Sequence, residues 1–167
     1  MFIHYVTQKN EPEEFSGWVK TFLNATAEMT LPDKSQPFYD LAQGLVDQGI
    51  KSVAANDTYE YYEAVYDCLD GLILSFVKEH KLGLEDTLVH IHKTLVAKNI
   101  DYGNSFDEVV DMMGLPGAVI RVMDKANRLK SLRTIDNNVN ESITDTELDF
   151  IGYLLLTLHY YQDKETV

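Results

Sequence analysis

The apolar residues of this chain recur at the spacing of a helix face in one segment after another, and this spacing constrains the fold most. In the segment 12–29 they occupy positions i, i+3, i+4, i+7 and i+8, as Phe15, Trp18, Val19, Phe22 and Leu23. The same spacing recurs in the segments 38–46, 58–80 and 84–99. No segment shows the strong apolar–polar alternation of a half-buried strand. We therefore predict an all-α fold, a helical bundle of about six helices.

Capping residues and glycines indicate where several of these helices begin and end. Asn10 stands three residues before Glu13, and Asp57 three before Glu60, which is the spacing of a capping box. Gly49 follows the apolar stripe of its segment and predicts a helix stop there. The weakest part of the helical prediction is the short segment that follows, 51–54.

Length and charge bound the class of protein. A chain of 167 residues predicts a single domain over 1–167, in which 1–83 is a helical half of unknown type packed against a second half, 84–167. The formal net charge is -13 and no basic stripe runs along the chain, which argues against a general nucleic-acid-binding surface. The single cysteine, Cys68, excludes an intramolecular disulfide. Because no secretory signal and no membrane-length apolar run is visible, we expect a cytoplasmic protein without a membrane partner.

The last predicted helix, capped by Ser142 or Thr144 and running to about Tyr161, is apolar on most of its circumference. Such a helix must be buried on most of its circumference, which one small bundle achieves with difficulty. Its apolar residues are Phe150, Ile151, Leu154, Leu155, Leu156, Leu158, Tyr160 and Tyr161. We therefore expect a homodimer, or a tetramer built from dimers, with the tyrosine-rich segment 58–66 in the interface.

Half of the chain's cations fall in one stretch of the sequence. Of 14 Lys and Arg residues, seven lie between positions 93 and 133: Lys93, Lys98, Arg121, Lys125, Arg128, Lys130 and Arg133. All three arginines are among them, and Asp101, Asp124, Asp145 and Asp149 lie in or near the same stretch. This local mixture in an acidic protein suggests a site for an anion together with a divalent metal, most simply phosphate with Mg²⁺.

Asp145, Asp149 and Tyr153 are four residues apart and share one face of the last helix. In the first turn of a helix that begins at Thr144, both Asp145 and Glu147 would be stabilised by the helix dipole. Asp149 has no such explanation and is surrounded by apolar residues, so its carboxylate requires a cation or hydrogen-bond partners. It either binds a metal or ligand or forms an ion pair with an arginine.

A second acidic stripe consists of Glu63, Asp67 and Asp70. If it faced the first stripe across the bundle, Glu63 and Asp67 would complete a magnesium site with Asp145 and Asp149. The alternative is a solvated helix face.

Two further groups of residues have the composition of a ligand site. Arg121, Asp124, Lys125 and Arg128 share one helix face and can grip phosphate, or else form a ladder of surface salt bridges. Lys98, Asn99, Asp101, Tyr102, Gly103 and Ser105 form a polar segment that could contact a base or ribose, or else cap a helix and turn.

The same residues resemble a known family. The series KN-DYG-S, R--DK--RL and ES--DT--D---Y resembles the nucleotide-modification-associated domain of phages and prophages, over roughly Leu88 to Tyr161. The motif positions of that family correspond to Lys98, Asn99, Asp101, Tyr102, Gly103 and Ser105, to Arg121, Asp124, Lys125 and Arg128, and to Glu141, Asp145, Asp149 and Tyr153. The resemblance implies a role in phage nucleotide metabolism or DNA modification, in the host cytoplasm.

The acidic helices are also similar to MazG-type all-α nucleoside-triphosphate pyrophosphohydrolases, which hold magnesium on a triphosphate with carboxylates from two helices. The chain departs from these enzymes because their paired ExxE motif is absent in good form. Two functions therefore stay open at this point. One is a Mg²⁺-dependent nucleotide hydrolase with catalytic Asp145 and Asp149, and the other is a non-enzymatic phage protein that sequesters a nucleotide signal or binds a host protein.

Overall fold

The computed structural model describes residues 12–30, 34–102, 104–134 and 140–162, and side chains within 14–30, 34–100, 104–133 and 143–162. Seven α-helices make up almost all of these ranges: α1 (Pro12–Ala27), α2 (Phe38–Ala55), α3 (Thr58–Glu79), α4 (Leu84–Tyr102), α5 (Ser105–Met113), α6 (Leu115–Thr134) and α7 (Asn140–Tyr161). The prediction of an all-α bundle is confirmed. The described helices number seven rather than about six, since the short α5 is separated from α6 at Gly114, whose φ of 71° only glycine adopts readily.

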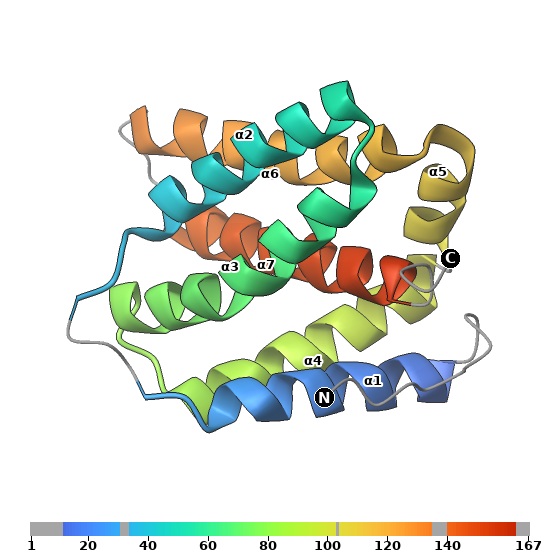
Figure 1. Cartoon of the computed structure of the whole chain (residues 1–167). Coiled ribbons are helices and arrows are strands. Elements are labelled where there is room, and N and C mark those ends of the chain that lie inside the picture. The colour runs from blue at the N-terminus through green and yellow to red at the C-terminus, as the bar shows by residue number, and fades with distance from the viewer. Residues whose placement is uncertain (1–11, 31–33, 103, 135–139, 163–167) are drawn as a thin grey trace.

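The long helices lie in three neighbouring pairs (Figure 1). Helices α2 and α6 form the upper pair in this view, α3 and α7 the middle pair, and α4 and α1 the lower pair. Helix α7 packs against both α3 and α6, and the short α5 packs against α6 where the chain passes from the lower pair to the upper one. Each pair combines one helix from 1–83 with one from 84–167, so both halves of the chain contribute to every layer.

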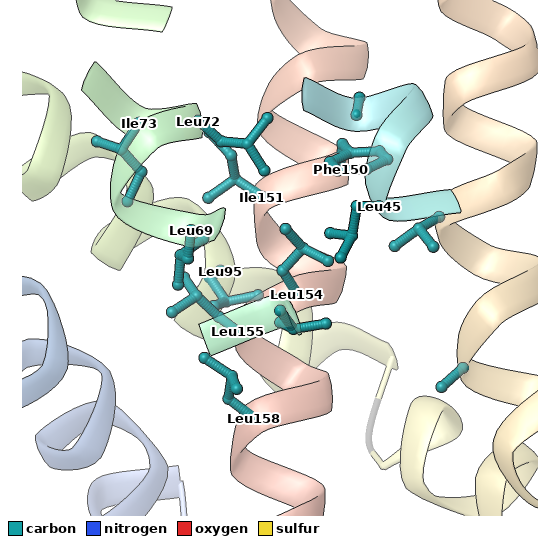
Figure 2. Close-up of a cluster of buried hydrophobic side chains, with 14 of the residues drawn as sticks. Leu45, Leu69, Leu72, Ile73, Leu95, Phe150, Ile151, Leu154, Leu155 and Leu158 are labelled. Carbon is teal, nitrogen blue, oxygen red and sulfur yellow. The ribbon is translucent and has the colours of Figure 1, made fainter. Parts of the chain in front are cut away.

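Helix α7 is the centre of the hydrophobic core (Figure 2). Five of its side chains are at most 1% exposed: Phe150, Ile151, Leu154, Leu155 and Leu158. Around them lie Leu45 of α2, Leu69, Leu72 and Ile73 of α3, and Leu95 of α4. Tyr160 and Tyr161 are buried as well.

One copy of the chain is therefore sufficient to cover α7. The argument that this helix needs a second copy is wrong, because residues from both halves of the chain surround it. A homodimer or a tetramer of dimers stays a prediction, without support from the burial of this helix.

Helix boundaries agree with the sequence in part. The Asp57 cap is confirmed, since its carboxylate accepts a hydrogen bond from the backbone N–H of Glu60 at 3.0 Å. Asn10, proposed as the first cap, lies outside the described residues. The stop at Gly49 is wrong: α2 continues to Ala55 and ends at Asn56, which adopts a left-handed conformation with φ of 53°. The segment 51–54 is accordingly helical.

Gly49 serves close packing rather than helix termination. A Cβ atom at this position would lie 3.0 Å from Cγ1 of Val119 in α6 and 3.1 Å from a ring carbon of Tyr61 in α3. Both neighbours are buried, so neither can move aside easily. The absence of a side chain therefore lets α2 approach α6 and α3 closely.

Two other boundaries differ from expectation and bear on the candidate site. Helix α7 begins at Asn140, ahead of Ser142 and Thr144, so Asp145 and Glu147 lie beyond its first turn and the dipole explanation for them is wrong. Helix α4 continues to Tyr102 instead of ending near Asn99, so most of the predicted polar loop is helical.

None of the helices in the described ranges has both the length and the apolar character that crossing a bilayer requires.

Two glycines of α2 give a matched test of this packing. Gly49→Ala should destabilise the protein by about 1–3 kcal/mol, because the new methyl group overpacks a buried contact. Gly44→Ala should stabilise it by roughly 0.5–1 kcal/mol, since a Cβ there meets nothing within 4 Å and alanine favours the helix. Urea unfolding of both variants measures the two changes, and equal changes for both would contradict the close approach at Gly49.

Candidate functional site

A cavity of about 350 Å³ opens between α4, α5, α6 and α7. Its polar lining includes Lys98 and Asn99 of α4, Ser105 of α5, Arg121 and Lys125 of α6, and Asp149 of α7. Apolar and aromatic side chains complete the wall. The cavity thus has three cationic side chains and one carboxylate among its described lining residues.

Helix periodicity explains why these side chains meet. On α4, His90, Thr94 and Lys98 are four residues apart, so they lie along one face and all three line the cavity. Arg121 and Lys125 have the same spacing on α6. Asp149 and Tyr153 repeat it on α7. Each helix therefore turns a polar stripe toward the same space.

Asp149 joins three helices through its carboxylate. Lys98 of α4 donates to Oδ1 from Nζ at 2.5 Å, and Lys125 of α6 donates to Oδ2 at 2.9 Å. The side chain of Asp149 is 27% exposed, that of Lys98 49% and that of Lys125 23%. Each carboxylate oxygen thus has its own ammonium partner. The ion pair anticipated for Asp149 exists, but with two lysines instead of an arginine.

The pKa of Asp149 reflects two opposing influences. Burial acts to raise it, but the hydrogen bonds and positive charges of Lys98 and Lys125 outweigh burial and hold the pKa below its ordinary value of 3.8. Asp149 is therefore ionised at neutral pH. Together with both lysines and Arg121, it leaves a formal charge of +2 at the cavity.

Two aromatic rings contribute to the cavity wall. Phe106 of α5 and Tyr153 of α7 both line it, and their rings are stacked with centroids 6.1 Å apart and an angle of 29° between the planes. Nζ of Lys125 lies 5.9 Å from the centroid of the Tyr153 ring. The cavity can therefore offer a flat aromatic surface to one part of a ligand and ammonium groups to another.

The structure brings together about half of the residues that the sequence singled out. Seven line the cavity: Lys98, Asn99, Ser105, Arg121, Lys125, Asp149 and Tyr153. The side chains of Asp101, Tyr102 and Glu141, and Gly103 as a whole, lie outside the described residues, so their predicted roles stay predictions.

Other candidates lie away from the cavity wall. Asp124, Arg128 and Asp145 are exposed and do not line it. Arg128 shares the face of Arg121 but lies seven residues further along α6, or about 10 Å at 1.5 Å per residue. Asp145 lies one turn nearer the start of α7 than Asp149.

The four carboxylates expected to hold Mg²⁺ are not assembled into one group. Among the described side chains, Glu63 and Asp67 are exposed on α3, and the carboxylate of Glu63 accepts a hydrogen bond from the Tyr59 hydroxyl at 2.6 Å. Asp149 is engaged by two ammonium groups, and Asp145 faces solvent. The four carboxylates therefore do not form one shared site. Binding of Mg²⁺, which one or two carboxylates can hold together with the phosphates of a ligand, stays a prediction.

On α7, the position of Glu147 differs most from the sequence-based expectation. Instead of capping the helix it is only 5% exposed, and its Oε2 lies 3.0 Å from Nε2 of His80, at the C-terminal end of α3. Burial raises the pKa of Glu147, together with the charge of Glu79, although His80 and Arg133 oppose this. No local sequence pattern could pair positions 80 and 147.

The sequence did not single out three cavity residues, His90, Thr94 and Phe106, as ligand-site candidates. The sequence pattern could have identified His90 and Thr94, because they precede Lys98 at four-residue intervals and therefore share its helix face. Phe106 had no such signal, since it lies beyond the end of α4 on a different helix.

Comparison of the chain with protein-family models, with curated proteins and with solved structures gives no match in any of the three.

The ion pairs of Asp149 predict a pH-dependent stability. A carboxylate whose pKa is lower in the folded than in the unfolded protein stabilises the folded state. This stabilisation is fully present above the pKa of the unfolded state and is lost as the pH falls through the pKa of the folded state. Asp149→Asn should therefore lower the free energy of unfolding at pH 7, and its difference from wild type should shrink below about pH 4. Urea unfolding at pH 7, 5, 4 and 3 measures this.

The exposed Asp145 provides the control on the same helix, because it forms no ion pair with a described residue that Asp145→Asn would break. The free energy of unfolding of Asp149→Asn could differ from that of wild type by the same amount at every pH, or the variant could be more stable at pH 7. Either result would mean that the two lysines do not stabilise the charged carboxylate.

Proposed function

We propose that the protein binds a nucleotide, or a related phosphorylated small molecule with a planar ring, in the cavity between α4 and α7. The observation that carries this proposal is the convergence of Lys98, Arg121 and Lys125 on one cavity of a chain with formal net charge -13. An acidic protein repels anionic ligands over most of its surface, so a local excess of cations with one internal counter-ion favours an anion at that place.

The lysines and the arginine of the cavity can bind an anionic group in different ways. Lys98 and Lys125 are held by Asp149 with their ammonium groups near each other, and ammonium groups bind phosphate as point charges. No ion pair to Arg121 exists among the described residues. Its planar guanidinium can therefore supply the bidentate contact with phosphate oxygens.

The size and the aromatic wall favour a nucleotide over inorganic phosphate. A volume of about 350 Å³ falls in the range of roughly 300–1,000 Å³ that small-molecule sites occupy. Phe106 and Tyr153 offer apolar and aromatic surface on which a base could rest. The resemblance of the sequence motifs to the phage nucleotide-modification family points in the same direction.

Binding without hydrolysis is the version that the donor set favours. A hydrolase of the MazG type holds magnesium with carboxylates from two helices, whereas the described cavity lining contains one carboxylate, and it is engaged by two lysines. We therefore propose a binder that sequesters its nucleotide, as a phage protein acting against a host nucleotide signal would. Hydrolysis is the competing outcome of the experiment.

Calorimetric titration with a panel of nucleoside mono-, di- and triphosphates and their parent nucleosides tests the proposal. A phosphorylated member should bind at least about tenfold more tightly than its nucleoside, since a hydrogen bond to a charged group contributes roughly 1.5–3 kcal/mol. Chromatography after incubation with Mg²⁺ should recover the ligand unchanged. Equal affinity for nucleoside and nucleotide would contradict a phosphate site, and a cleaved product would establish hydrolysis instead.

Two arginines of α6 supply matched variants. Arg121→Gln should weaken nucleotide binding about 10–100-fold, because it removes one charged contact from the cavity. Arg128→Gln makes the same chemical change at an exposed position outside the cavity and should have little effect. The same loss in both variants would mean that the anion binds along the surface of α6 rather than in the cavity.

A further inference from the structure

A second polar cluster lies on the opposite side of α7, away from the cavity. We propose that Glu79, His80 and Glu147 bind a divalent transition-metal ion, with Zn²⁺ as the best match to their chemistry. Glu79 and His80 are consecutive residues at the C-terminal end of α3, and Glu147 reaches them from α7. The proposal is independent of nucleotide binding, since none of the three residues lines the cavity.

The spacing of the donor atoms suits one shared ion. One ligand atom from each of the three side chains lies within 4.8 Å of the other two, and no other described group of His, Cys, Asp and Glu side chains meets this condition. Nε2 of His80 and Oε2 of Glu147 are 3.0 Å apart. Two ligands that each lie about 2.0–2.2 Å from a tetrahedral zinc ion are roughly 3.3–3.6 Å apart. His80 and Glu147 therefore need little movement, whereas the Glu79 carboxylate, within 4.8 Å of both, can approach by rotation of its side chain.

Glu79 is already oriented by contacts outside the cluster. Its Oε1 accepts a hydrogen bond from the backbone N–H of Phe38 at the start of α2, at 2.9 Å, and Oγ of Ser75 lies at 3.5 Å. One oxygen of the same carboxylate lies within 4.8 Å of the ligand atoms of His80 and Glu147. Outer hydrogen bonds of this kind fix the direction of a metal-binding carboxylate.

Electrostatics also favour a cation here. Glu147 is only 5% exposed, yet its one hydrogen-bond partner among the described residues is an imidazole, which leaves a buried carboxylate poorly compensated. Glu79 adds a second negative charge, and the C-terminal end of α3 contributes its partial negative charge.

Arg133 is the cation whose charge acts on this cluster, and it does not complete a salt bridge with it. Its guanidinium lies 4.4 Å from the centre of the Tyr39 ring, over the face of that ring. The cluster proper therefore contains two carboxylates and one imidazole.

The ligand types select the class of metal. One imidazole and two carboxylates match Zn²⁺ and similar first-row ions, and three protein ligands leave a fourth position open to water. Mg²⁺ prefers an octahedral shell of oxygen atoms and suits this set poorly.

Titration of tag-free, metal-stripped protein tests the site by calorimetry and thermal unfolding. Wild type should bind one Zn²⁺ per chain, its melting temperature should rise with Zn²⁺, and Mg²⁺ should produce no such rise. Glu79→Gln and His80→Gln should each weaken Zn²⁺ binding by at least about tenfold. Loss of a residue that only hydrogen-bonds to a metal ligand already lowers metal affinity by about that factor. Both positions are more accessible than Glu147, so these variants keep the buried carboxylate in place.

Glu63→Gln is the matched control, because it removes an exposed carboxylate from the same helix about 24 Å from Glu79. Its Zn²⁺ affinity should equal that of wild type, and circular dichroism should show all three variants folded. Absence of Zn²⁺ binding by wild type, or equal affinity in all variants, would overturn the site and leave Glu79, His80 and Glu147 as a structural contact between α3 and α7. Neither result would alter nucleotide binding, which is measured separately.

Discussion

Burial of α7 is the constraint on which the polar features of this protein depend. The helix runs through the centre of the bundle, yet it carries two acidic residues, Glu147 and Asp149, among apolar ones. Residues two apart on a helix point about 200° away from each other, so the two carboxylates face opposite sides. A buried or half-buried carboxylate needs a partner, and here Glu147 meets His80 on one side while Asp149 meets Lys98 and Lys125 on the other. Both candidate sites thus follow from the same packing requirement.

The ion pairs of Asp149 with Lys98 and Lys125 do more to position the two ammonium groups than to stabilise the fold. Partly exposed ion pairs contribute about 0–1 kcal/mol each, which is small beside the burial of five side chains of α7 at 1% exposure or less. Their effect is to hold two ammonium groups beside each other before any ligand arrives. A site that is arranged in advance loses less entropy on binding, so a modest structural contact can serve recognition well.

The sequence predicted the helical class well because amphipathic spacing is a local property, and it predicted much of the cavity lining because residues four apart on one helix share a face. Arg121, Lys125, Asp149 and Tyr153 were found in this way and do line one cavity, and Lys98 was singled out separately as part of a polar segment. Features that depend on contacts between distant segments could not be predicted. The stop at Gly49 was wrong because its neighbours, Val119 and Tyr61, belong to other helices, and the role of Glu147 was missed because its partner lies 67 positions away.

We propose that the cavity between α4 and α7 receives a phosphorylated ligand with a planar ring. A crystal structure of the protein with the tightest-binding nucleotide of the panel tests this proposal. We expect phosphate density against Lys98, Arg121 and Lys125, with the base along Phe106 and Tyr153. Density for the nucleotide elsewhere on the molecule, with the cavity between these helices empty, would contradict it.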